Sequence, residues 1–204
     1  MGCNIHLYTE KRKGDEWVCV DHFKINPYYK DFPDEEEQYQ LIPIYDTRDY
    51  LLFATLANVR NYSGITPIDA PRGLPNDVSD TVKESSANWG VDGHSYSWFT
   101  AKELFVHKNK NPFTKCNGMI SPKAQEALDE LGVVPNMWCQ GTTEEGWERR
   151  DWIIPNSVLN GLIEALKERM CEELYIWDSL DEKEKNKRIW EEADNFRIVF
   201  WFDN

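Results

Sequence analysis

The sequence has no apolar run long enough to cross a membrane and no Cys-x-x-Cys motif. A membrane-spanning helix needs about 18 or more apolar residues, so we expect no membrane partner. The five cysteines are odd in number and widely spaced. That usage is typical of a reducing compartment, where thiols serve as small core residues. We therefore expect a soluble, cytoplasmic protein.

Basic residues are scarce: 23 Lys and Arg stand against 36 Asp and Glu, a formal net charge of −13 over 204 residues. Nucleic acids and anionic membranes are bound chiefly through Lys and Arg, so neither is expected as a partner. The charge leaves open a small ligand in a locally positive pocket or a basic protein. Nine each of Trp, Tyr and Phe exclude a disordered chain, because so many aromatic rings need a core.

The apolar pattern predicts an α+β fold in a single domain, residues 1–204. Residues 3–8 and 16–21 alternate between apolar and polar side chains, and Lys13-Gly14-Asp15 supplies a turn between them. This arrangement predicts a β-hairpin. Residues 196–202 are aromatic and β-branched, which predicts a buried strand returning to pair near the hairpin. Several helices would pack on the resulting antiparallel sheet.

Helices are predicted where apolar residues recur at helical spacing after a start signal. Ser121-Pro122 places Pro at the first helical position, and Thr100 with Glu103 forms a capping box. Ser179 with Glu182 forms a second capping box. The predicted helices cover residues 50–60, 79–89, 100–107, 121–132, 155–170 and 179–193, and loops or irregular segments cover 26–43, 61–76, 108–120 and 141–146.

Four motifs occur together in one family. They are MGCNIHLY (1–8), RDYLLF (48–53), PRGLPNDVS (71–79) and DGHSYSW (92–98). On these motifs the first half of the chain resembles small, uncharacterised proteins of bacteriophages and some bacteria that begin Met-Gly-Cys-Asp-Ile-His. It departs at Asn4, where the family has Asp, and near Asn88. The resemblance implies an accessory phage gene, a context that includes proteins sequestering the nucleotide signals of bacterial immunity.

Residues 70–79 predict a stiff loop that leads into a helix. Two prolines restrict the backbone, Gly73 permits close approach or a positive φ, and Arg72 carries a charge that can hold an anion. Backbone N–H groups at a helix start near Ser79 would favour the same ligand. The Walker spacing is absent. The alternative is a rigid turn in which Asp77 and Ser79 only cap the helix.

Residues 89–98 are the densest polar and aromatic stretch of the chain. Trp and Tyr rings offer stacking faces, and His and Ser offer short hydrogen-bonding groups, which suits a nucleotide. The alternative is a short strand with its rings in the core. With Arg60 as a second cation, the candidate ligand-binding residues are Arg60, Arg72, Gly73, Trp89, His94, Ser95, Tyr96, Ser97 and Trp98.

Catalysis is the rival interpretation of the same stretch. His94 beside Asp92 could act as a general acid or base. The nucleophile-elbow motif Gly-x-Ser-x-Gly and the metal motif His-Glu-x-x-His are both absent from the sequence. A hydrolase or phosphodiesterase that depends on His94 therefore stays open as the alternative.

Cys3, His6, Cys19 and His22 have the spacing of zinc ligands on the predicted hairpin. Residues three apart on a strand face opposite sides, and no Gly or Pro lies within either pair to make a knuckle. We therefore expect no metal and no cofactor, with the cysteines in the core and the histidines exposed or hydrogen-bonded.

Acidic runs at residues 34–37 and 181–192 suggest a third possibility, a DNA mimic that inhibits a basic protein. Lys and Arg interleave with the acids in the second run, which is typical of a solvated helix face. Our leading hypothesis is non-catalytic sequestration of a small anionic, nucleotide-derived ligand as a phage anti-defence function. A homo-oligomer is compatible with it, although no residue indicates one.

Overall fold

The computed structural model describes residues 2–34, 38–142, 144–176 and 180–203. The chain forms two compact units. The sheet unit comprises Met1–Thr47, Arg72–Leu104 and Leu162–Asn204, and the ribbon unit comprises Arg48–Pro71 and Phe105–Gly161. The prediction of a single domain stays a prediction. Two compact units would be two domains only if each could fold by itself, and the division into units does not measure that.

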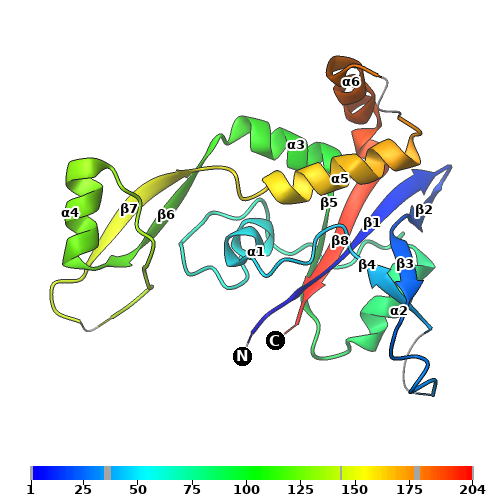
Figure 1. Cartoon of the computed structure of the whole chain (residues 1–204), viewed down its shortest axis with the longest axis horizontal. Helices are drawn as coiled ribbons and strands as arrows, with labels where there is room; N and C mark the ends of the chain where they lie inside the picture. Colours follow the sequence, from blue (N-terminus) through cyan, green and yellow to red (C-terminus); the bar gives the residue numbers. More distant parts are fainter. Residues whose placement is uncertain (1, 35–37, 143, 177–179, 204) are drawn as a thin grey trace. The chain divides into compact units, whose positions relative to one another are not determined.

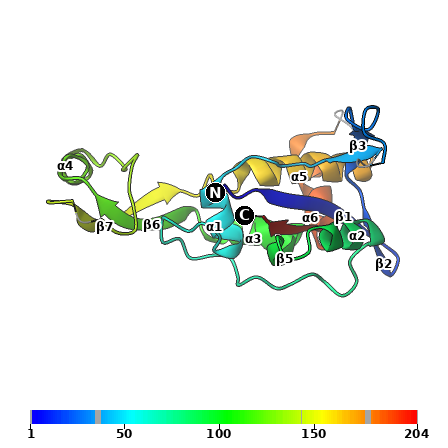
Figure 2. The same cartoon turned by 90° about the horizontal axis from the view of Figure 1, so that it is seen from below.

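A four-stranded antiparallel sheet forms the centre of the sheet unit (Figure 1). Its order is β2 (Glu16–Cys19), β1 (Ile5–Lys13), β8 (Phe196–Phe202) and β5 (His94–Thr100). The start of β1 and the end of β8 lie side by side (Figure 2), since Ile5 pairs with Phe202. The α+β fold, with an antiparallel sheet built from the N-terminal hairpin and the C-terminal strand, is confirmed.

Strand β8 is buried along its whole length, because strands flank it on both edges and side chains cover both faces. On one face, Trp201 and Val199 pack with Tyr8 and with Val82 of α2 (Asp80–Asn88). We call this the α2 face. The aromatic and β-branched composition of β8 suits a strand buried on both sides.

Helix α5 (Asn160–Glu173) crosses β8 and β1 (Figure 1). The predicted helical stripe is buried, including Leu162, Leu166 and Met170. Lys11 Nζ on β1 donates to the carbonyl of Glu173 at 2.7 Å, which ties the end of the helix to the sheet. Among the described residues no helix has the length and apolar character that crossing a bilayer requires.

The helix cap predicted at Thr100 forms as expected, whereas the one predicted at Ser79 does not. Before α3 (Ala101–Lys110), Thr100 N donates to Glu103 Oε2 at 2.8 Å and Glu103 N to Thr100 Oγ1 at 3.1 Å. The predicted capping box is confirmed. Helix α2 does begin after Ser79, but the Ser79 side chain makes no cap hydrogen bond. Its backbone N–H donates to Glu10 Oε1 on β1 at 2.7 Å instead.

A fully buried ion pair joins neighbouring strands of the sheet. Arg197 Nε on β8 donates to Glu10 Oε2 on β1 at 2.6 Å. Arg197 Nη1 also reaches Asp77 Oδ1 at 2.8 Å, and the guanidinium lies 4.0 Å from the ring centroid of Trp17. Together with the Ser79–Glu10 bond, these contacts fix residues 77–79 against the sheet.

In the ribbon unit, β6 (Phe113–Ile120) pairs antiparallel with β7 (Glu148–Pro155). Helices α1 (Tyr50–Ala57) and α4 (Pro122–Leu131) belong to the same unit. Helix α4 has the predicted Ser121 cap and ends at Gly132 with a φ of 66°. A separate core contains Ala54, Ile65, Cys116, Ile120 and Trp152.

Several sequence-based predictions are wrong. Residues 108–120 are not irregular, because α3 extends through Lys110 and β6 covers Phe113–Ile120. The buried positions of β6 are Cys116, Gly118 and Ile120, a weak apolar signal. Residues 26–43 are not all loop, because β4 (Tyr39–Ile42) pairs with β3 (His22–Ile25). The helix expected from residue 155 begins at Asn160, since β7 extends through Pro155. Residues 35–37 and Ser179 lie outside the described residues. The helix expected from Ser179 begins at Glu182, and its cap is Asp181, whose Oδ1 accepts from Glu184 N at 2.9 Å.

Replacing Arg197 by Met should lower the free energy of unfolding by about 3–5 kcal/mol, because Glu10 is left as a buried charge without its main partner. Denaturant unfolding measures the loss. Arg188→Met is the matched control: its exposed pair with Glu184 on α6 (Glu182–Glu192) has a 3.3 Å separation and should contribute only about 0.3–0.5 kcal/mol. Equal losses in the two variants would contradict a structural role for the buried pair.

Candidate functional site

Two hydrogen bonds hold the loop that carries Arg72 against β5. Gly73, with a φ of 79°, donates its N–H to the carbonyl of Tyr96 at 2.8 Å. Arg72 N donates to Oγ of the fully buried Ser97 at 3.2 Å. The structure therefore brings together two stretches that the sequence analysis singled out separately.

The Arg72 guanidinium already has partners. Nη2 pairs with Glu103 Oε1 at 2.9 Å, Nη1 donates to the carbonyl of Trp98 at 3.3 Å, and the group lies 4.5 Å from the ring centroid of Phe99. The side chains of Arg72 and Glu103 are 24% and 38% exposed, so the ion pair is accessible from solvent. An anion would reach Arg72 only by competing with Glu103.

An aromatic cluster occupies the α2 face at the end of the sheet. The rings of Tyr8 and Tyr96 stack on Trp201, with centroids 5.4 and 5.6 Å away. Trp89, at the C-terminus of α2, lies against the imidazole of His6 at a centroid distance of 3.9 Å. Both Trp89 and Tyr96 are half-buried, so neither residue is closed off from solvent.

His6 is oriented by a carboxylate from the other end of the chain. Its Nε2 lies 3.2 Å from Asp203 Oδ2. Asn4 holds the same carboxylate with its backbone N–H at 2.8 Å and its Nδ2 at 3.1 Å. A histidine fixed in this way keeps Nδ1 for a ligand or a proton, the arrangement found in acid–base sites.

Burial lowers the pKa of the His6 imidazole below its usual 6.5, and the hydrogen bond and charge of Asp203 offset only part of that shift. Burial alone would raise the pKa of Asp203, but hydrogen bonds from Asn4 and His6 outweigh it and hold that pKa low. Near neutral pH the pair is therefore a neutral imidazole beside a carboxylate.

His94 lies on the other face of the sheet. It stacks on Phe202, with centroids 6.1 Å apart, whereas His6 stacks on Trp201, and consecutive strand residues point to opposite faces. A β-bulge between His94 and Ser97 includes Ser95 with a φ of 53°, and such bulges re-aim side chains.

The His94 ring is anchored locally. Nδ1 lies 3.0 Å from Ser95 Oγ, and Nε2 is buried without a hydrogen-bond partner among the described residues. Asp92, the predicted partner of His94, is exposed, and its N–H donates to the carbonyl of Trp89. No hydrogen bond between Asp92 and His94 occurs in the part of the chain that the structure describes.

Arg60 belongs to the ribbon unit, so it is not joined with Arg72 in one compact unit. Its φ is 49° and its Nη1 donates to Tyr62 Oη at 3.3 Å. Its role as a second cation for the ligand stays a prediction.

The four residues with zinc-ligand spacing have other partners. Cys3 is buried, His6 is bonded to Asp203, and His22 Nε2 lies 3.6 Å from Glu172 Oε2. Cys19 pairs across the sheet with Glu10, four positions along β1 from His6, which is roughly 13 Å at the usual strand rise. Within the described ranges, no group of three or more His, Cys, Asp or Glu side chains could hold a metal ion.

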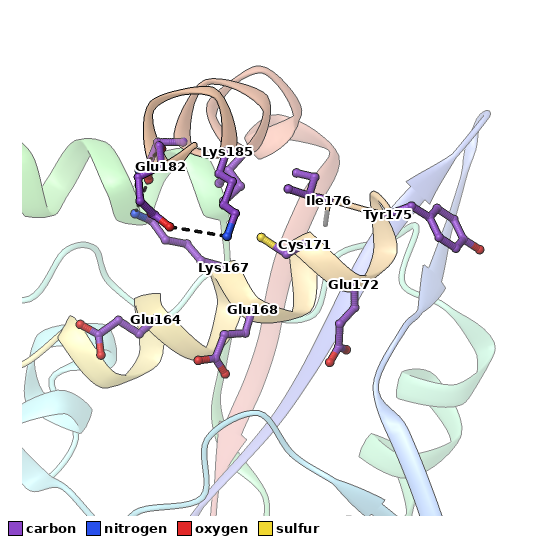
Figure 3. Close-up of a pocket in the computed structure, with 11 residues that line it drawn as sticks. Glu164, Lys167, Glu168, Cys171, Glu172, Tyr175, Ile176, Glu182 and Lys185 are labelled. Atoms are coloured by element: carbon purple, nitrogen blue, oxygen red, sulfur yellow. Dashed lines mark hydrogen bonds and ion pairs between the residues drawn. The ribbon is translucent and has the colours of Figure 1, made fainter. Parts of the chain in front are cut away.

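A groove of about 760 Å³ runs between α5 and α6 (Figure 3). Its charged lining includes Glu164, Glu168, Glu172 and Glu182 against Lys167 and Lys185. Both lysines are engaged, Lys167 Nζ with Asn186 Oδ1 at 3.0 Å and Lys185 Nζ with Glu182 Oε1 at 3.5 Å. The excess of carboxylates disfavours an anionic ligand in this groove.

Comparison with protein-family models, curated proteins and solved structures found no match to this chain. The resemblance to the phage family therefore stays a prediction.

His6 was expected to be exposed or hydrogen-bonded, and its hydrogen bond to Asp203 agrees with that prediction. Neither residue was predicted to belong to the ligand site. The signal for their contact was the predicted pairing of the terminal strand with the N-terminal hairpin. An antiparallel pairing of those segments brings the residues just inside both ends together. The register, His6 opposite Trp201, was not readable from composition.

Asp203→Asn should lower the pKa of His6 further, because it removes the charge that opposes the effect of burial. An NMR titration of the imidazole resonances measures this shift. Asp92→Asn, a change at an exposed carboxyl on the neighbouring turn, serves as the control and should leave the His6 titration in place. A His6 pKa that stays constant or rises in Asp203→Asn would contradict the described pairing.

Proposed function

We propose that the sheet unit binds a small nucleotide-derived ligand at the cluster of His6, Trp89 and Tyr96, and sequesters it without chemical conversion. The observation that supports this proposal is the contact of a half-exposed Trp ring with an imidazole that burial keeps neutral and Asp203 holds in place. The cluster combines stacking surface with a fixed polar group, which is the chemistry a nucleobase needs.

Stacking would hold the base of the ligand, and directed hydrogen bonds would fix its orientation. A base stacked on an aromatic ring contributes about 1–3 kcal/mol. His6 Nδ1 is the ring nitrogen that Asp203 does not occupy, so it supplies the polar contact to the base or sugar. Stacking together with two or three charge-assisted hydrogen bonds of about 1.5–3 kcal/mol each supports micromolar affinity, about −8 kcal/mol.

The anionic part of the ligand would replace Glu103 at Arg72. The pair is partly exposed, and such ion pairs contribute only about 0–1 kcal/mol to stability. A phosphate can bind the guanidinium through two parallel N–H···O bonds, so it can compete with Glu103 for Arg72. Sequestration of a nucleotide signal by a phage anti-defence protein is the biological role that we propose.

A His-dependent enzyme acting on nucleotides is the second candidate. The contacts from Asn4 through Asp203 to His6 favour it, because a general base needs an orienting group behind it. Mass spectrometry of the ligand after incubation separates the two candidates: a sequestering protein returns the ligand intact, whereas an enzyme returns a product. A DNA-mimicking inhibitor stays the third proposal, and the exposed carboxylates of α6 are its support.

His6→Asn should weaken binding of cyclic nucleotides or ADP-ribose derivatives by about 1–3 kcal/mol, because the shorter side chain loses the contact at Nδ1. Isothermal calorimetry measures the affinity. His94→Asn is the matched control on the opposite face of the sheet and should leave the affinity unchanged. If His94→Asn weakened binding and His6→Asn did not, the ligand site would lie at His94 and not at His6.

Glu103→Gln should tighten binding of the anionic ligand, since it frees the charge of Arg72 while the Gln side-chain oxygen can still cap Thr100. Arg72→Ala should weaken binding by about 1.5–3 kcal/mol, the range for a hydrogen bond to a charged group. Calorimetry and thermal unfolding are measured on both variants. Loss of stability in Arg72→Ala with ligand affinity retained would make Arg72 purely structural.

A further inference from the structure

The tautomer of His6 determines which ligand group its imidazole can bind. Nε2 lies 3.2 Å from Asp203 Oδ2. Burial opposes the ionisation of Asp203, but hydrogen bonds from Asn4 and His6 outweigh it and hold its pKa low. The group is therefore a carboxylate, which can only accept hydrogen bonds. The proton of the neutral imidazole sits on Nε2 as a result, and Nδ1 is left as an acceptor.

Asn4 fixes this tautomer from behind the carboxylate. Its backbone N–H and its Nδ2 both donate to Asp203 Oδ1, at 2.8 and 3.2 Å, and Nδ2 also lies 3.1 Å from Oδ2. Because Asn4 meets Asp203 with donors, both carboxylate oxygens act as acceptors toward their neighbours. Asn4 and Asp203 are thus positioning residues, which act on a ligand only through the state of the His6 ring.

His6 Nδ1 is open to a ligand. It has no hydrogen-bond partner among the described residues, and it is not one of their side-chain atoms that are closed to solvent. The His6 side chain is 23% exposed. His94 differs in this respect, because its unpaired nitrogen, Nε2, is buried. Of these two histidines, only His6 offers an unused ring nitrogen that solvent reaches.

Trp89 provides the surface on which a base can lie beside this acceptor. The centroids of the Trp89 and His6 rings are 3.9 Å apart, and the ring planes are inclined by 37°. An imidazole is smaller than an indole, so it covers only part of the indole face. The lone pair of an aromatic nitrogen lies in the plane of its ring. A base stacked on Trp89 next to the imidazole would therefore present its edge to Nδ1.

From this geometry we propose that His6 selects a base that carries an exocyclic amino group, as adenine does. An N–H of the amino group would donate to Nδ1 while the base stacks on Trp89. A carbonyl oxygen in the same place would set its lone pairs against that of Nδ1, and a site built to accept an N–H rejects analogues that lack one. The inference rests on the function proposed for the sheet unit, and it narrows the ligand to nucleotides with an amino-substituted base.

Calorimetry on the whole chain with AMP and two analogues tests the proposal. Purine riboside monophosphate has a hydrogen in place of the amino group, and dimethylated AMP keeps the amino nitrogen without an N–H. AMP should bind at least tenfold more tightly than either analogue, which equals about 1.4 kcal/mol. The sugar hydroxyls and the phosphate are the same in all three, so equal binding would overturn the inference and leave the ligand site in place. Binding of none of them would contradict the proposed function as well.

A variant of His6 connects the preference to this side chain. His6→Phe keeps a ring against Trp89 but removes the acceptor, so the advantage of AMP over purine riboside monophosphate should disappear. His22→Phe is the matched control, because His22 Nε2 also lies near a carboxylate, Glu172 Oε2 at 3.6 Å, but outside the cluster. This control should keep the full preference. A preference for AMP that persists in His6→Phe would overturn the proposal.

Nitrogen NMR of the imidazole measures the tautomer without any ligand. The wild type should carry its proton on Nε2. In Asp203→Asn, the amide oxygen should take the Oδ1 position, where it accepts both donors of Asn4, so the amide N–H faces His6. The proton should then move to Nδ1 and the preference for AMP should be lost, whereas Glu172→Gln should leave the His6 tautomer unchanged. A wild-type proton on Nδ1 would overturn the proposal whether or not the variants fold.

Discussion

The buried pair of Arg197 and Glu10 determines how the rest of the sheet unit is arranged. It joins β8 to β1, and its remaining hydrogen bonds hold Asp77 and Ser79. Residues 77–79 connect the Arg72 loop to α2, so the same network positions the loop on β5 and the helix that ends at Trp89. Removing a charge pair from water has a large desolvation cost. Here that cost is offset by the hydrogen bond within the pair, by the bond from Arg197 to Asp77 and by the bond from Ser79 N–H to Glu10.

Much of the fold was predictable where the local signals were strong. The terminal strands and the capping box at Thr100 follow directly from alternation and side-chain chemistry. The ribbon of β6 and β7 was missed because its buried face presents Cys116 and Gly118, which no hydrophobic pattern marks as core. Their burial depends on Trp152 and Ile65, distant residues that packing alone brings together.

The candidate site was predictable only in part. The sequence drew attention to residues 89–98, and the structure does place Trp89 and Tyr96 in one aromatic cluster with Trp201. It separates His94 from them, because the bulge at Ser95 turns that side chain to the other face. A positive φ at a serine leaves no pattern in composition. His6 and Asp203 are nearly two hundred residues apart, and only strand register joins them.

The central position of β8 has a consequence for how the protein is made. Strand β8 lies between β1 and β5, so the sheet closes only after the chain has been translated through Phe202. Until then β1 and β5 lack β8, the strand that pairs with both. Contacts between residues so far apart in the sequence slow folding. The His6–Asp203 pair needs the same closure. The cluster around His6 is therefore assembled only once β8 has paired with β1.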